Sequence, residues 1–293
     1  TVPDVDPISV QLRKFLPEMV VYRMARVRNI GLQRTIYRLA QDRPKLMKRV
    51  LLSAAKRQLG NGVDMANFTP NYNPWDQRLC AVPNGDLFKT IKQGHASVVT
   101  EQIDCFTEKG IKLRNGETLE ADIVVTATGL NIQMLGGAQA TIDGKAVQPS
   151  DSMVYRGVML RDIPNMAMIF GYTNSSWTLK ADIACEYIYR LLNHMDKIGA
   201  HQVIPRDHKN CVSDKPMMDM QSGYLTRSAS QMPKQGTQAP WLVLNDYVRD
   251  LPLLRYGRVD DESLEFGHFS APKCQSKRQS KRQNILKSLL SSQ

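Results

Sequence analysis

The sequence lacks several patterns that would place it in a common class of protein. Its cysteines include no C-x-x-C pair, and they are Cys80, Cys105, Cys185, Cys211 and Cys274. Such an odd, scattered set predicts neither a disulfide framework nor a zinc site. No apolar run approaches the roughly 18 residues that a transmembrane helix requires, and no signal peptide opens the chain. We therefore expect a cytoplasmic protein without a metal site.

Glycine-rich turns are also missing. No G-x-G-x-x-G or G-x-G-x-x-A pattern occurs, and Gly60-Asn61-Gly62 follows a predicted helix rather than a strand. These 293 residues therefore contain no standard cradle for a dinucleotide pyrophosphate. The chain begins at Thr1 rather than at a methionine, which suggests a fragment of a longer protein.

What is present is ordinary for a globular protein, with 42% hydrophobic and 23% charged residues. The net charge of +11 is concentrated at the two ends. Residues 1–60 carry 13 Lys and Arg against 4 Asp and Glu, whereas residues 271–293 carry 6 against none. The SKRQ repeat at 276–279 and 280–283 predicts that the basic tail over 271–293 is disordered.

Residues 8–60 predict a basic helical segment. Asp42 as a cap and Pro44 in the first turn predict the start of its second helix, which Gly60 ends. One face of this helix is lined by Lys45, Lys48, Arg49, Lys56 and Arg57. Such a face either contacts an anionic membrane surface or is simply solvated, and both interpretations stay open.

The stretch ADIVVTATGLN, residues 121–131, predicts a strand buried on both faces of a parallel sheet. Its side chains become small toward Gly129, so a ligand could approach the backbone there. Before it, strands are predicted over 96–100, 103–106 and 111–113, and Asn115-Gly116 predicts a type I′ hairpin turn. Residues 165–171 predict a further buried strand.

A long amphipathic helix follows that strand. Its predicted buried face consists of Leu179, Ile183, Tyr187, Ile188, Leu191, Leu192 and Met195. The polar residues 173–176 could cap its start, and its free N–H groups could hold a phosphate or a polarised carbonyl. Lys180 in the first turn could add charge there or be solvated. Residues 200–266 are rich in Pro, Gly and polar residues, with a short helix predicted over 244–251.

Three motifs in order carry a family resemblance. They are FTPNYNPWDQRLCAVPNGDLF (68–88), ADIVVTATGLN (121–131) and GYTNSSWTLKADI (171–183). Together they resemble flavin-containing Baeyer–Villiger monooxygenases of the ethionamide-activating type, over roughly residues 8–266. The resemblance implies an α/β flavoprotein monooxygenase with two dinucleotide domains, truncated at the amino terminus. In that family both glycine-rich turns precede the point where this chain begins, so the chain would correspond to the carboxyl-terminal portion.

The resemblance also implies a division into domains. Residues 1–62 would be a basic helical segment of the NADPH domain. Residues 63–131 would be the rest of that domain, with a strand meander and a return strand. Residues 132–270 would be the carboxyl-terminal part of the FAD domain, followed by the tail over 271–293.

The cofactors implied by the resemblance are FAD and NADPH. Arg78, in YNPWDQR, matches the segment that bears the family's active-site arginine. A permanently charged guanidinium there would stabilise a flavin peroxide anion and the oxyanion that forms when it attacks a carbonyl. From its chemistry alone, Arg78 could equally be a surface residue. The cofactor-binding residues implied are Thr128, Gly129, Leu130, Thr173, Asn174, Ser175 and Ser176.

The activity implied is insertion of one oxygen atom of O2 beside a ketone, or onto the sulfur of a thioether or thioamide. Two alternatives remain open at the level of sequence. One is a non-catalytic basic protein that binds membrane or nucleic acid, and the other is an inactive truncated remnant. Nucleic-acid binding usually places aromatic residues among basic ones, but the SKRQ tail has none. We therefore expect no nucleic-acid partner.

Overall fold

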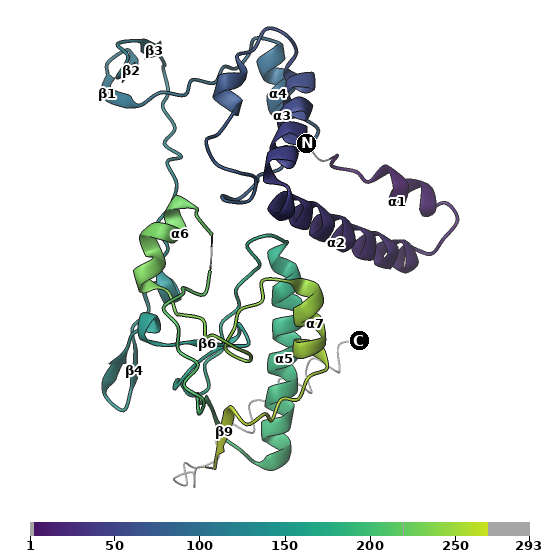
Figure 1. The fold of residues 1–293 in the computed structure, drawn as a ribbon, viewed down its shortest axis with the longest axis vertical. Coiled ribbons are helices and arrows are strands. Elements are labelled where there is room, and N and C mark those ends of the chain that lie inside the picture. Colours follow the sequence, from purple (N-terminus) through teal and green to yellow (C-terminus); the bar gives the residue numbers. More distant parts are fainter. Residues whose placement is uncertain (1–2, 219, 269–293) are drawn as a thin grey trace, which may run out of the picture.

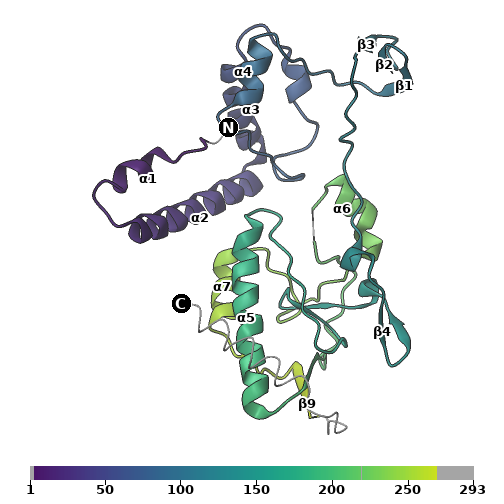
Figure 2. The same ribbon diagram turned by 180° about the vertical axis from the view of Figure 1, so that it is seen from behind.

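The computed structural model describes residues 3–218 and 220–268. Figure 1 shows an amino-terminal group of helices, a small antiparallel sheet, and a larger body built around one long helix. A thin extended segment joins the small sheet to that body, and the view from behind shows the same connection (Figure 2). The predicted tail over 271–293 lies outside the described residues.

The amino-terminal group contains the predicted basic helices. Its elements are α1 (Pro7–Leu12), α2 (Glu18–Asp42), α3 (Pro44–Leu59), the 3₁₀ helix η1 (Met65–Phe68) and α4 (Asp86–Lys92). Pro44 opens α3 and Gly60, with φ of +82°, ends it, as predicted. The prediction that Asp42 caps α3 is wrong, because Asp42 is the last residue of α2. Only Arg43 leaves the helical conformation, since the residue before a proline avoids it.

The small sheet has the order β1-β2-β3, all antiparallel: β1 (Ile103–Thr107), β2 (Gly110–Leu113) and β3 (Thr118–Glu120). The strands predicted over 103–106 and 111–113 are thus confirmed, whereas residues 96–100 form no strand. The hairpin at Asn115-Gly116 is confirmed, but its predicted type I′ turn is wrong. Gly116 has φ of +92° while Asn115 does not have a positive φ. A hydrogen bond from Gly116 N–H to the Leu113 carbonyl closes a turn that ends in this glycine.

The prediction of a buried strand over 121–131 is wrong. These residues form the extended segment that joins β3 to the larger body (Figure 1), and both Ile123 and Val125 are 82% exposed. A buried parallel strand needs a neighbouring strand on each edge. None of the strands in the described part of the chain pairs with residues 121–131, so the side chains of Ile123, Val124 and Val125 are exposed.

The larger body is built on α5 (Trp177–Ile198) and α7 (Tyr247–Arg255), which pack against each other. Around them lie three two-stranded antiparallel pairs: β4 (Ala140–Ile142) with β5 (Lys145–Val147), β6 (Val154–Tyr155) with β7 (Met159–Leu160), and β8 (Gln202–Pro205) with β9 (Leu264–Gly267). Short helices complete it: η2 (Met134–Gly137), η3 (Pro149–Asp151), α6 (Gly223–Ser228) and η4 (Ala229–Gln231). The helix predicted over 244–251 corresponds to α7.

The buried strand predicted over 165–171 is wrong. This segment makes a single bridge, between Ala167 and Met159, and Ile169 is 45% exposed. The strand that it bridges, β7, has two residues and is paired with β6, so no long sheet edge is available to extend. The molecule is therefore a mixed α/β protein with small sheets rather than one large parallel sheet.

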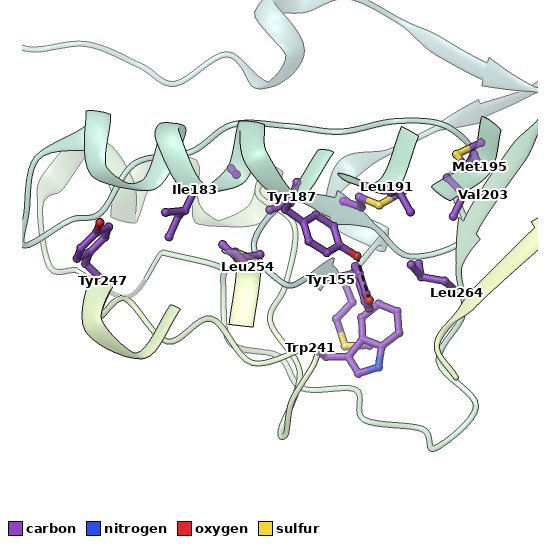
Figure 3. Close-up of a cluster of buried hydrophobic side chains, with 14 of the residues drawn as sticks. Tyr155, Ile183, Tyr187, Leu191, Met195, Val203, Trp241, Tyr247, Leu254 and Leu264 are labelled. Atoms are coloured by element: carbon purple, nitrogen blue, oxygen red, sulfur yellow. Dashed lines mark hydrogen bonds between the residues drawn. The ribbon is translucent and has the colours of Figure 1, made fainter. Parts of the chain in front are cut away.

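The predicted apolar face of α5 forms the core of the body. Five of its residues are buried: Leu179, Ile183, Tyr187, Leu191 and Met195. They face Tyr155, Trp241, Leu254, Val203 and Leu264 from elements before and after α5 in the sequence (Figure 3). Each fully buried aliphatic side chain stabilises the fold by about 1.5–3 kcal/mol. Leu192, at the edge of the predicted face, is 53% exposed.

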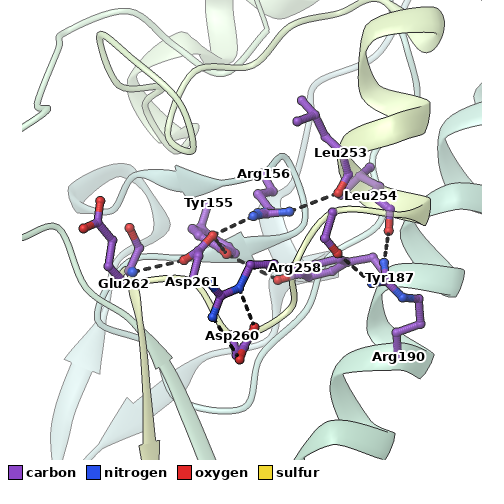
Figure 4. Close-up of polar contacts among 12 residues, drawn as sticks. Tyr155, Arg156, Tyr187, Arg190, Leu253, Leu254, Arg258, Asp260, Asp261 and Glu262 are labelled. Carbon is purple, nitrogen blue, oxygen red and sulfur yellow. Dashed lines mark hydrogen bonds and ion pairs between the residues drawn. The ribbon is translucent and has the colours of Figure 1, made fainter.

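A polar network ties the carboxyl-terminal loop to this core. The Tyr155 hydroxyl donates to Asp261 Oδ2 at 2.7 Å, and the Arg156 guanidinium donates to the same oxygen at 2.6 Å (Figure 4). The Tyr187 hydroxyl donates to that of Tyr155 at 3.3 Å. Burial raises the pKa of Tyr155, so its hydroxyl stays protonated and remains a donor.

No helix in the described part of the chain is long and apolar enough to cross a membrane. The same residues contain no group of three or more His, Cys, Asp or Glu side chains arranged to hold a metal ion.

Candidate functional site

The loop that carries Arg78 is fixed by the amino-terminal helices. Lys48 on α3 donates through Nζ to the Pro70 carbonyl and, at 3.3 Å, to the Tyr72 carbonyl. The ring of Trp75 meets that of Tyr37 on α2 edge-on, with 6.0 Å between ring centres. Part of the basic face of α3 therefore stabilises this loop and is not simply solvated.

A second contact links the same loop to the larger body. Gln221, just before α6, donates its backbone N–H to the Asp76 carbonyl at 3.0 Å. Arg78 itself is exposed, and within residues 3–218 and 220–268 it makes no recorded hydrogen bond or ion pair. Its guanidinium is thus unengaged by the described residues and free to meet an anion.

The loop over 173–176 is held by Asn245, a residue 72 positions away. The Thr173 N–H donates to Asn245 Oδ1 at 3.1 Å, and Asn245 Nδ2 donates to Thr173 Oγ1 at 2.6 Å. Asn174 Nδ2 donates to the Asn245 carbonyl at 3.0 Å. These three hydrogen bonds fix the backbone that leads into α5.

The amino end of α5 has no side-chain cap. Ser176 occupies the N-cap position, but the prediction that a side chain of this loop caps the helix is wrong. The Ser176 hydroxyl is instead 2.8 Å from that of Thr178. The first N–H groups of α5 are therefore not satisfied by a capping side chain and can donate to a ligand.

A hollow lies beside this loop, between α2 and the start of α7. Its lining includes Arg34, Arg38, Arg249, Asn174 and Ser175. Asn174 Oδ1 is buried, and it has no hydrogen-bond partner among the described residues. The hollow thus combines cationic side chains with one unused acceptor.

Asp246, at the N-cap of α7, is the acidic residue of the same hollow. It accepts hydrogen bonds from Arg34 at 2.8 Å and from the Val248 N–H at 3.0 Å. Burial raises the pKa of this carboxyl, but the hydrogen bonds and charge of Arg34 outweigh burial and hold it below its usual value. Asp246 is therefore ionised and offsets part of the positive charge of the hollow.

The third predicted segment, with Thr128, Gly129 and Leu130, lies against α6. The Arg227 guanidinium donates to the Leu130 carbonyl at 3.1 Å, and the Ile132 N–H donates to Ser228 Oγ at 3.3 Å. Gly129 has φ of +97°, and a Cβ added there would meet nothing within 4 Å. The glycine is therefore required by the backbone conformation and not by a packed neighbour.

The structure brings the predicted segments together only in part. The Arg78 loop and residues 130–132 both contact the segment over 221–228. Tyr37 of α2 contacts the Arg78 loop and also lines the hollow beside residues 174–175. No contact is recorded, within the described ranges, between Arg78 and the loop over 173–176.

Sequence analysis missed one residue of this region and left the role of another open. Asn245, with φ of +46°, lies within the helix predicted over 244–251, but no role was assigned to it from the sequence. Its Asn-Asp dipeptide ahead of a helix is a capping signal that could have indicated it. Lys180 is neither solvated nor free, because it is buried and its Nζ lies 2.8 Å from Asp250 Oδ2.

Comparison with known proteins gives the family context. No family model matches the chain. Among curated proteins, it is 54% identical over 267 residues to the "Probable FAD-binding monooxygenase AlmA" of Acinetobacter baylyi, covering 91% of this chain and 54% of that protein. It is 48% identical over 271 residues to the FAD-containing monooxygenase EthA of Mycobacterium tuberculosis, covering 92% and 55%. The EthA of Mycolicibacterium smegmatis is 47% identical over 267 residues.

The chain thus spans about half the length of the curated relatives it matches. The matched span is 267–271 residues, so the similarity is not confined to the three motifs. The resemblance inferred from those motifs is confirmed: over about 91% of its length this chain is similar to FAD-containing monooxygenases that include EthA.

Proposed function

We propose that this chain is part of a flavin-dependent monooxygenase that uses FAD, NADPH and O2. The reaction would insert one oxygen atom beside a ketone, or add it to the sulfur of a thioether or thioamide. The observation that carries the proposal is the 48% identity to an FAD-containing monooxygenase over 271 residues, a span that includes the Arg78 segment. In this enzyme, residues 1–62 and 63–131 would belong to the NADPH domain, and residues 132–270 would belong to the FAD domain.

The loop over 173–176 fits the polar edge of a flavin ring. That edge presents one N–H donor between two carbonyl acceptors. Asn174 Oδ1 is a buried acceptor without a described partner, and the amino end of α5 offers N–H donors without a side-chain cap. The positive end of the helix dipole would also favour negative charge on the ring. When bound there, FAD would accept a hydride from NADPH and activate O2.

Arg78 would act on the oxygen atoms. Its guanidinium carries a fixed charge and makes no recorded bond to the described residues. It could therefore donate to an anionic oxidant and to the oxyanion that develops on a ketone carbonyl. Oxidation of sulfur passes through no carbonyl oxyanion, so it would depend on Arg78 less.

The test uses a chimera in which the part of the Acinetobacter baylyi relative that this chain does not match is joined to residues 1–293. We expect Arg78→Ala to leave flavin reduction by NADPH unchanged. Ketone oxygenation should fall by about 100-fold or more, because a preorganised donor to the oxyanion is lost. Arg78→Lys should recover little, because an ammonium cannot reproduce the planar fork.

Stopped-flow reduction and steady-state product analysis separate the two steps. Arg57→Ala, which removes an exposed arginine at the end of α3, is the matched control and should change neither rate. Ketone oxygenation by Arg78→Ala at the wild-type rate would remove Arg78 from the site.

A further inference from the structure

A buried ion pair joins α5 to α7 beside the loop over 173–176. Lys180 is 5% exposed and Asp250 is 6% exposed, and Lys180 Nζ lies 2.8 Å from Asp250 Oδ2. The Tyr172 hydroxyl donates to the same Oδ2 at 2.8 Å. Burial, together with the Asp250 carboxylate, raises the pKa of Tyr172, so that hydroxyl stays protonated. The Asp250 carboxylate therefore accepts hydrogen bonds from both Lys180 and Tyr172.

The Lys180 ammonium has fewer hydrogen-bond acceptors than it has N–H donors. An ammonium carries three N–H donors. Among the described residues, Asp250 is the only hydrogen-bond acceptor recorded for Lys180 Nζ, and the ring of Tyr172 is 5.6 Å away. A desolvated ammonium is costly unless its remaining donors find partners. Lys180 thus has donors to offer to a further acceptor.

Two small hollows adjoin the ammonium. Both include Gly157, Lys180, Val243 and Asp250 in their walls. The apolar residues of the first hollow include Phe170, Met217 and Met218, with Tyr172, Thr173, Gln235 and Asn245 as its polar residues. The apolar residues of the second include Leu242, Leu253 and Leu254, and Arg156 also lines it. Apolar side chains therefore flank the ion pair on two sides.

Gly157 keeps the ammonium accessible. Its φ is +67°, and a Cβ at this position would lie 3.2 Å from Lys180 Nζ. Any other residue would place carbon against the charged group and would also strain the backbone. The turn at Gly157 thus leaves space where a polar atom could reach the lysine.

We propose that Lys180 binds the oxygen of a neutral carbonyl compound, a ketone or an ester, whose two apolar arms occupy the two hollows. A neutral ligand is favoured over a carboxylate because Asp250 already balances the ammonium, and a second anion would be repelled. Apolar groups on both sides of the carbonyl match the apolar walls on both sides of the ion pair. Arg78 is not in the wall of either hollow, and ligand binding there requires no flavin.

The first measurement uses the chain as it is, without FAD. Calorimetric titration with dibutyl ketone should show saturable binding, and sodium nonanoate should bind more weakly. Infrared spectra of the bound ketone should show its C=O stretch at lower frequency than in a hydrocarbon solvent, because the oxygen accepts a charged hydrogen bond. Absence of ketone binding, tighter binding of nonanoate, or an unshifted C=O stretch would each overturn the proposal.

The second measurement removes the ion pair as a unit. Lys180→Met with Asp250→Asn avoids a stranded charge and leaves an acceptor for Tyr172. Loss of a hydrogen bond from a charged donor should weaken ketone binding about tenfold or more. The matched control is Lys197→Met with Asp196→Asn, an exposed pair on the same helix, which should bind as wild type does. Equal ketone affinity in the two double variants, each folded by circular dichroism, would assign Lys180 a structural role only.

Discussion

At the scale of single residues, Asn245 connects the loop before α5 to the segment before α7. It bonds to Thr173 and Asn174 with both of its side-chain groups and its carbonyl. Its φ of +46° is a conformation that asparagine tolerates better than most residues. The position of the loop over 173–176 therefore depends on a side chain far away in sequence.

Substitutions at Asn245 separate the contribution of its side-chain hydrogen bonds from that of its tolerance for a positive φ. Asn245→Gly removes the side-chain hydrogen bonds without backbone strain and should lower the free energy of unfolding by about 1–2 kcal/mol. Asn245→Ala adds left-handed strain of about 1–2 kcal/mol, so it should be the less stable variant. Urea denaturation measures both. If the alanine variant were as stable as wild type, these hydrogen bonds would contribute nothing to the fold.

Only those residues of the site that lie within local sequence motifs could be predicted. Arg78 and the residues over 173–176 lie within motifs that can be read along the chain. Asn245 and the Lys180–Asp250 pair are contacts between residues about 70 positions apart. No local pattern specifies such partners, because they are selected by the way α5 and α7 pack.

At the scale of secondary-structure elements, α5 contributes buried side chains to the main core of the larger body. Its apolar residues recur at helical spacing, and the structure buries five of them against β6, α7 and Trp241 (Figure 3). Gly199, with φ of +69°, ends the helix in the left-handed conformation that a glycine accepts without strain. The helix was predicted correctly because its apolar residues recur at helical spacing over several turns.

Replacing side chains of α5 by alanine should lower the free energy of unfolding more at buried positions than at exposed ones. Ile183→Ala removes a fully buried side chain and should lower the free energy of unfolding by about 2–5 kcal/mol. Leu192→Ala, at a position that is 53% exposed, should change it by less than about 1 kcal/mol. Chemical denaturation of both variants checks the contrast. Equal losses would mean that the orientation of α5 is wrong.

Strands were predicted less well than helices, for a physical reason. A helix satisfies its own backbone, whereas a strand needs partners that its sequence does not specify. The hairpin strands over 103–107 and 110–113 are partners of each other, so the local pattern was sufficient. The apolar runs over 121–131 and 165–171 indicate strands, but the described residues provide no adjacent strands for a continuous ladder.

At the scale of the whole molecule, the segment over 121–131 is the exposed connection between two folded parts (Figure 1). Exposed, unpaired backbone opens easily to proteases. Thermolysin, which cuts beside apolar residues, should cleave within 121–131 before it cleaves any bond between residues 150 and 267. Mass spectrometry of early fragments identifies the cuts. Initial cleavage within α5 would show that the connection is protected.

The affinity of the chain for FAD is also a property of the whole molecule. These 293 residues contain no glycine-rich pyrophosphate turn, so the contacts of the loop over 173–176 would have to hold FAD without one. We expect the chain alone to bind FAD weakly or not at all. Desalting followed by absorbance spectroscopy tests this, and retention of stoichiometric yellow flavin would contradict it.

We propose above that these residues belong to an enzyme that transfers an oxygen atom from O2 to a ketone or a sulfur. The most direct measurement supplies the FAD-loaded chimera with NADPH, heavy-oxygen-labelled O2 and either a ketone or a thioether. Mass spectrometry of the products follows the label. We expect one labelled oxygen atom in each ester or sulfoxide formed, with one NADPH consumed for each. Unlabelled product, or NADPH consumption without oxygenated product from either substrate, would contradict it.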